Sequence, residues 1–126
     1  MGKELLTPTR IYVKQVLSLL PDSNIHGISH ITGGAFYDKI SRILPEKINV
    51  RINKGSWNVP KIFKLIQNKG NVAEREMYHT LNMGIGMVLI VRPAAAKNII
   101  AKLASIKLKA WIIGEAVKGK KEIEII

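Results

Sequence analysis

The sequence contains no cysteine, and it has no long hydrophobic run. Without cysteine there are no disulfides, thiolate nucleophiles, iron–sulfur clusters or zinc sites with thiolate ligands. The longest apolar stretch, Gly84–Val91, is far shorter than the ~20 residues of a membrane-spanning helix. The amino-terminal residues lack the apolar region of a signal peptide. We therefore expect a cytoplasmic protein that does not enter a membrane.

Acidic residues are scarce. Nine Asp and Glu stand against 20 Lys and Arg, which gives a net charge of +11. This imbalance predicts anionic partners such as nucleotides, phosphorylated metabolites or nucleic acid. Aromatic residues make up only 6% of the chain, and they do not alternate with basic ones as in single-strand-binding proteins. Helix-turn-helix, zinc-finger and RNA-recognition signatures are also absent, so a nucleic-acid-binding module is the less favoured alternative.

The chain of 126 residues has the length of one domain, 1–126. Apolar residues recur at helical spacing in some segments and form short runs in others. Helices are predicted at 10–20 (capped by Thr9), 36–44, 59–67, 73–81 and 93–106, and strands at 25–28, 48–52, 87–91, 111–113 and 122–126. The order αβαβααβαββ predicts an α+β fold, a layered α/β sandwich with a mixed sheet.

The stretch from His26 to Phe36 reads as a strand, a glycine turn and the start of a helix. Such a turn can bind an anion, because free amide N–H groups and the helix dipole point at it. Gly33 and Gly34 would let the backbone approach an anion closely, while Thr32 and His30 could add side-chain donors. The alternative is an ordinary helix start that is capped by Thr32.

A second glycine pair follows Asn82, at Gly84 and Gly86. It precedes a strand, whereas a dinucleotide-binding fingerprint follows one and opens a helix. Two interpretations remain open. The glycines either allow a tight entry into the strand, or keep the backbone clear for a ligand toward which the Asn82 amide points.

Other chemistry-bearing residues are less informative. His26 and His30 are four residues apart, but on a strand that spacing separates them by about 13 Å. His79 is the only other histidine, so we expect no metal site. Glu74 and Glu76 lie two apart on a predicted helix and do not face each other. We interpret them as a solvated face and Trp57 as a packing residue.

Several stretches together resemble the carboxy-terminal domain of aminoimidazole ribonucleotide synthetases, also called phosphoribosylformylglycinamidine cyclo-ligases. The resemblance covers nearly the whole chain in order and spacing. It rests on residues 5–14, 26–36, 42–45, 56–57, 60, 70–72, 76–77, 82–87, 111 and 113–115. The stretch Pro8–Lys14 is what separates this family from its relatives, among them formylglycinamide ribonucleotide amidotransferases, selenophosphate synthetases and thiamine monophosphate kinases.

The resemblance implies an ATP- and magnesium-dependent ring closure that converts formylglycinamidine ribonucleotide to aminoimidazole ribonucleotide, a step of purine biosynthesis. The family's enzyme is a homodimer whose active site lies between two halves of each subunit. The amino-terminal half carries most ATP and metal contacts, and it would precede Met1. We therefore expect this chain to be part of a longer or split enzyme, and to neither hydrolyse ATP nor close the ring alone.

The resemblance also implies a site for the substrate's 5′-phosphate, although it assigns no catalytic residue. We expect the phosphate at Thr32, Gly33 and Gly34 with His30 beside them, His26 and Asn82 in the cleft, and Gly84 and Gly86 keeping the backbone clear. Arg10 either contacts a phosphate or forms an ion pair that fixes the first helix. Ala35 departs from the glycine that many family members have there, a small change that we expect to be tolerated. The alternatives are a related amidotransferase domain or a basic nucleic-acid-binding module.

Overall fold

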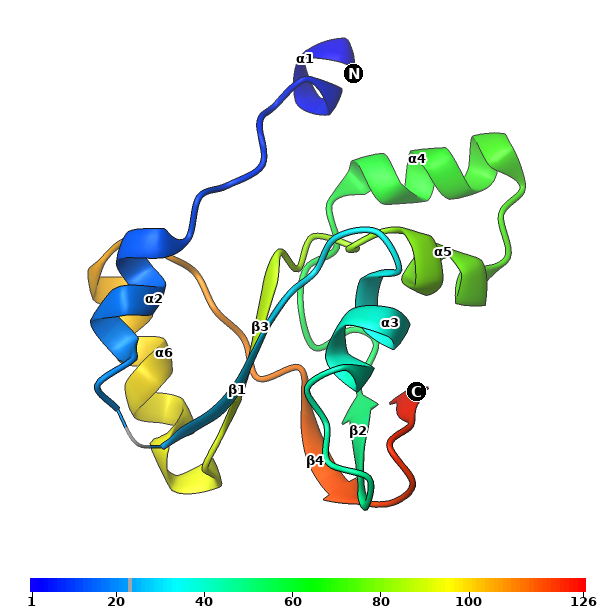
Figure 1. Cartoon of the computed structure of the whole chain (residues 1–126). Helices are drawn as coiled ribbons and strands as arrows, with labels where there is room; N and C mark the ends of the chain where they lie inside the picture. Colours follow the sequence, from blue (N-terminus) through cyan, green and yellow to red (C-terminus); the bar gives the residue numbers. More distant parts are fainter. Residues whose placement is uncertain (23) are drawn as a thin grey trace.

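A computed structural model describes residues 1–22 and 24–126. Its helices and strands alternate along the chain (Figure 1). In order they are α1 Gly2–Leu5, α2 Val13–Leu19, β1 Ile25–His30, α3 Ala35–Ser41, β2 Ile48–Ile52, α4 Lys61–Gly70, α5 Glu74–Thr80, β3 Met87–Val91, the 3-10 helix η1 Pro93–Ala95, α6 Ala96–Ser105, β4 Gly114–Lys118 and β5 Ile123–Ile125. Among the described residues, no helix is both long and apolar enough to cross a membrane.

The strands form two sheets rather than the single sheet expected. β1 and β3 make an antiparallel ribbon, and β4, β2 and β5 make a second sheet in that order. The second sheet is mixed, because β2 pairs antiparallel with β4 and parallel with β5. The α+β class and the mixed sheet are therefore confirmed, and the split into two sheets is a correction.

The larger core lies between α3, α5 and strand β2. Phe36 and Ile40 of α3 are fully buried, as their spacing of one helical turn predicts. Phe36 meets the rings of Trp57 and Tyr78 at centroid distances of 5.9 and 5.8 Å. The Trp57 indole Nε1–H donates to the carbonyl of Met83 at 2.9 Å. Trp57 is therefore a packing residue, as predicted, and it also anchors the chain ahead of β3.

A smaller core joins α2 and α6 to the other face of the ribbon. It is centred on Leu19, Ile99 and Leu103. Because side chains alternate along a strand, β3 serves both cores. Val88 belongs to the larger cluster and Leu89 packs against the smaller one. The ribbon thus holds the two parts of the domain together, with α2 and α6 on the left of Figure 1.

Two predicted elements were placed wrongly. The helix predicted at 10–20 is α2, which begins at Val13 with Tyr12 at its N-cap. No side chain caps it, so Thr9 does not. The residues before Tyr12 form an exposed arm that leads back to α1. Residues 111–113 are not a strand, and β4 begins after them, at Gly114. β4 is an edge strand, so most of its side chains stay exposed and it shows little apolar patterning.

Candidate functional site

The two glycine-containing loops lie next to each other in the fold. The antiparallel register of β1 and β3 pairs His30 with Met87. Just beyond this pair, the Ile31 N–H donates to the Gly86 carbonyl at 2.9 Å. In Figure 1 both loops lie at the end of the ribbon nearest α4. Backbone pairing thus brings together two loops that are far apart in the sequence.

The predicted anion loop opens α3 and is accessible. Thr32 and Gly33 are exposed. Gly34 is the N-cap of α3, with φ +83° and no side-chain capping bond, so Thr32 does not cap the helix. The Ala35 N–H donates to the Thr32 carbonyl at 2.8 Å. Within the described residues the N–H groups of Gly33 and Gly34 have no protein acceptor, so two backbone donors remain for water or a ligand.

Ala35 occupies the position where the resemblance expects glycine. It is fully buried and has φ +40°, in the left-handed region that glycine adopts without steric cost. The chain therefore keeps the glycine-like backbone here with a methyl group packed into the core.

A carboxylate lies beside this loop, which the sequence did not suggest. A side chain at Gly34 would overlap the Asp38 carboxylate, which is folded back toward the start of its own helix. The same carboxylate is 3.5 Å from Nε2 of His79, an exposed residue on α5. His79 also stands edge-on to Tyr37, with centroids 5.6 Å apart. An anion in the loop would thus meet one negative group, whose charge a protonated His79 would offset.

The Asn82–Gly86 loop is shaped by its own neighbours. Asn82 Oδ1 accepts from the Gly84 N–H at 3.0 Å, so this side-chain oxygen folds over its own loop. Gly84 has φ +91°, and a side chain there would strike the ring of Pro60. A side chain on Gly86 would overlap the hydroxyl of Tyr12. Internal packing accounts for both glycines, and a ligand contact at Asn82 stays a prediction.

The two strand histidines do not converge. His30 is exposed at the loop end of β1, with its ring edge-on to Tyr12 at 6.0 Å. His26 is exposed at the opposite end, where the pairing register shifts between Ile25 and Gly27. No group of three potential metal ligands occurs in the described part of the chain. His30 thus lies with the loops, and His26 does not.

A hollow of about 1020 Å³ lies along β3 between α6 and the segment that leads to β4. Of the predicted site residues, Arg10, Gly84 and Gly86 line it, while the loop 32–34 does not. Arg10 is exposed, and among the described residues it has no carboxylate partner, so no ion pair fixes α2 through it. The cation–π pair of Lys109 and Trp111, 5.4 Å apart, is on the wall of this hollow and was missed by the sequence reasoning.

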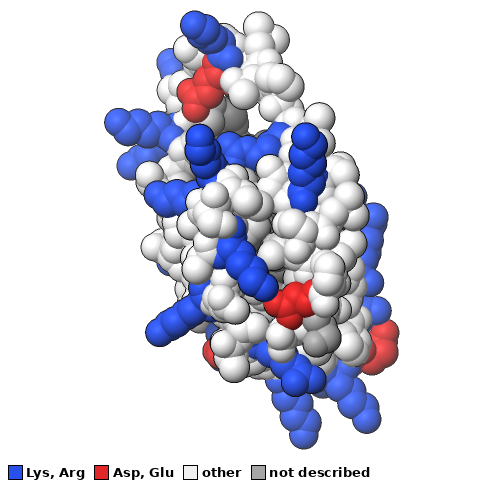
Figure 2. All heavy atoms as spheres, turned by 90° about the vertical axis from the view of Figure 1, so that its left-hand side faces the viewer, with Lys and Arg blue, Asp and Glu red and all other residues white. Residues whose placement is uncertain are grey.

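Charge is distributed unevenly. On the face that carries α2 and α6, Lys and Arg side chains far outnumber Asp and Glu (Figure 2). Away from the loops, hydrogen bonds from Arg51 and Asn49 lower the pKa of Glu124, and burial in the aromatic cluster raises the pKa of Tyr78. These two shifts belong to the structural framework, while the basic face is open to an anionic partner.

Comparisons with known proteins identify relatives of this chain. The chain is 53% identical to a phosphoribosylformylglycinamidine cyclo-ligase of Carboxydothermus hydrogenoformans over 99% of its own length, but only 36% of the relative's length. It is 50% identical to the cyclo-ligase of Pseudothermotoga lettingae over 99% of this chain and 37% of that protein. The chain thus spans about a third of the curated relatives it matches.

A solved structure shares the fold. The crystal structure of E. coli HypE, a hydrogenase maturation protein, superposes with a TM-score of 0.71 at 16% identity. The match covers 92% of this chain and 36% of HypE. At this identity the likeness concerns the fold alone. Residues 1–126 match the family described as AIR synthase related protein, C-terminal domain, and the chain therefore belongs to that family.

Proposed function

We propose that this chain acts as the carboxy-terminal part of a phosphoribosylformylglycinamidine cyclo-ligase. The observation that carries the proposal is the identity of about half the residues with such enzymes over nearly the whole chain. In the complete enzyme, ATP would drive closure of the imidazole ring of formylglycinamidine ribonucleotide. The remainder of the enzyme would supply most ATP contacts and the dimer interface.

We propose further that the loop Thr32–Gly34 binds the 5′-phosphate of the ribonucleotide. Two backbone donors at the start of α3 have no acceptor among the described residues, and this supports the role because such groups stabilise phosphate oxygens. His30 lies on the same surface and could donate from its ring. Asn82, Gly84 and Gly86 border this surface, while Arg10 and the more distant His26 would contact other parts of the substrate only in the complete enzyme.

We expect the magnesium ion that accompanies ATP to be bound mostly by the remainder of the enzyme, as the family resemblance implies. Such an ion is commonly held by one or two carboxylates and the phosphates themselves. The described residues hold no group of three His, Asp or Glu side chains that could bind a metal ion.

The activity is tested with a chimera in which this chain replaces the corresponding residues of the Carboxydothermus hydrogenoformans cyclo-ligase. We expect ADP release that depends on formylglycinamidine ribonucleotide, and none from the 126-residue chain alone. An inactive chimera beside an active parent enzyme would contradict the proposal. Turnover with the amide precursor, instead of the amidine, would favour an amidotransferase domain.

The phosphate loop is tested separately by amide NMR of the 126-residue chain. Ribose 5-phosphate is expected to shift the resonances of Gly33 and Gly34, while ribose without the phosphate leaves them unchanged. Shifts that cluster elsewhere would reject this loop. A parallel titration with a DNA duplex tests the alternative, a basic nucleic-acid-binding module. That alternative requires an affinity for DNA that falls steeply as the salt concentration rises.

A further inference from the structure

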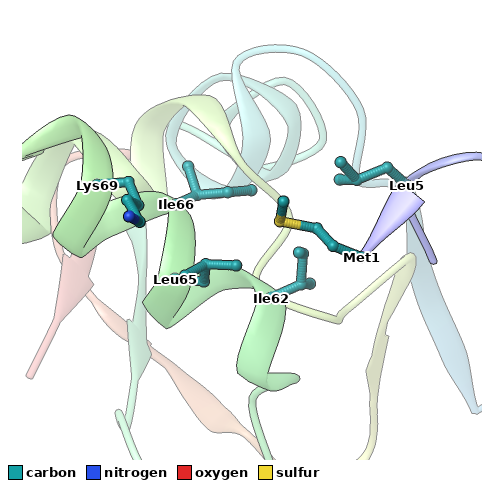
Figure 3. Close-up of a pocket in the computed structure, with 6 residues that line it drawn as sticks. All are labelled: Met1, Leu5, Ile62, Leu65, Ile66 and Lys69. Atoms are coloured by element: carbon teal, nitrogen blue, oxygen red, sulfur yellow. The ribbon is translucent and has the colours of Figure 1, made fainter. Parts of the chain in front are cut away.

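Helix α4 presents an apolar face that the described chain covers poorly. None of its ten residues is buried. Ile62, Leu65 and Ile66 line a hollow of about 250 Å³ that faces Met1 and Leu5 (Figure 3). Leu65 is 37% exposed and Leu5 59%. An isolated helix shorter than ~12–15 residues is marginal in water, so α4 depends on packing. Phe63 packs against the larger core, while Met1 and Leu5 only partly cover the side of α4 that lines the hollow.

The hollow is connected to the candidate site. Pro60, at the N-cap of α4, lies against Gly84. Tyr12, at the end of the arm, lies against Gly86, whose carbonyl accepts from the Ile31 N–H. The residue before α4 and the residue at the end of the arm therefore both contact the Asn82–Gly86 loop, which one backbone hydrogen bond joins to Ile31, just before the loop 32–34.

The charge around the hollow is one-sided. Helices α1 and α4 together carry Lys3, Lys61, Lys64 and Lys69 against a single carboxylate, Glu4. None of these lysines forms an ion pair with another described residue. A partner that complements this surface would present apolar side chains surrounded by carboxylates.

We propose that the trough between α1 and α4, lined by Met1, Leu5, Ile62, Leu65 and Ile66, is the docking surface for the amino-terminal part of a cyclo-ligase. The proposal rests on the proposed function. This chain matches 36% of its relative as a carboxy-terminal domain, so a segment of roughly two thirds of that protein precedes it there. In the relative, that segment enters through the counterpart of α1. A partner seated in the trough would also cover the two loops and exclude water from them.

Because the chain contains no cysteine, the reaction rate of a single introduced cysteine measures how accessible that position is to solvent. In the 126-residue chain, Leu65→Cys is expected to react with a maleimide about as fast as Lys118→Cys, an exposed position on β4 that lies outside the trough. In the chimera with the Carboxydothermus hydrogenoformans segment, we expect Leu65→Cys to react at least about tenfold more slowly, with Lys118→Cys unchanged. Peptide mass spectrometry distinguishes these thiols from any in the relative's segment, and hydrogen exchange of α3 reports that the domain is folded.

The outcomes separate this proposal from the proposed function. Equal reaction rates of the two thiols in a folded chimera would overturn the docking surface, even if the chimera closes the ring. Protection of Leu65→Cys without turnover would support docking and count against the activity. Protection that grows with concentration in the 126-residue chain alone would assign the trough to a second copy, and would overturn the proposal.

Discussion

Asn49, at the centre of the mixed sheet, is expected to act as a clamp on the turn between β4 and β5. Its side chain is almost fully buried, at 7% exposure of the residue. Oδ1 accepts from the N–H groups of Lys120 at 2.6 Å and Glu122 at 2.8 Å. Nδ2 donates to Glu124 at 3.2 Å. One residue of β2 thus satisfies the backbone of a turn more than 70 residues away in sequence.

Asn49→Ala removes an acceptor that two amides share. A buried donor left without a partner costs about 1–3 kcal/mol, and water can reach this turn, so we take about 1 kcal/mol for each amide. With the lost bond to Glu124, the expected destabilisation is about 2–3 kcal/mol. Asn49→Asp keeps both acceptor bonds but places a carboxylate beside Glu124. Its destabilisation should be smaller than that of Asn49→Ala, and it should decrease as the pH is lowered because protonation removes the repulsion between the carboxylates.

Urea denaturation followed by circular dichroism measures these free energies of unfolding. Asn68→Ala is a suitable control, because Asn68 is exposed on α4 and alanine favours a helix. Its free energy of unfolding should change by less than about 0.5 kcal/mol. If Asn49→Ala also costs less than about 0.5 kcal/mol, water replaces the clamp and the reasoning is wrong.

Three further outcomes are expected. Gly34→Ala should destabilise the chain by about 2 kcal/mol or more in urea titrations, because its φ of +83° is unfavourable for alanine and the added methyl meets a carboxylate. Gly86→Ala should cost about 1 kcal/mol by displacing the Tyr12 hydroxyl, and in a double-mutant cycle Tyr12→Phe should recover part of that loss. The lowered pKa of Glu124 contributes stability that is complete above its ordinary value of 4.5 and lost as the pH falls through the folded value, so Arg51→Gln should flatten the acid limb of stability against pH.

The larger core was predictable because its residues repeat at regular intervals. Phe36 and Ile40 mark one face of α3, and the apolar residues of β2 alternate with polar ones in the sequence, although the polar Asn49 is buried as well. The arm was not predicted because apolar residues in it, such as Ile11, continue the helical spacing, although Ile11 is 78% exposed. Spacing alone does not reveal whether a partner surface is present, and the division into two sheets depends on pairings that a single sequence does not encode locally.

The candidate site was predicted in part for the same reason. Glycine turns are visible in sequence, so the loop 32–34 and the Gly84–Gly86 pair were found, and the fold brings them together. The contribution of Asp38 and His79 was not visible, because it depends on α3 packing beside α5. The contact that requires glycine at position 86 was equally invisible in the sequence, because it comes from Tyr12, 74 positions earlier.

The order of strands in the mixed sheet bears on how the protein is made. β2 lies between β4 and β5, and both of these come from a much later stretch of the sequence, residues 114–125. During translation, both hydrogen-bonding edges of β2 stay unpaired until β4 and β5 have been synthesised. An unpaired strand of this kind readily associates with other chains, so the nascent polypeptide should need shielding over that interval. Deletion of residues 123–125 should for the same reason lower the yield of soluble material more than its effect on the finished fold suggests.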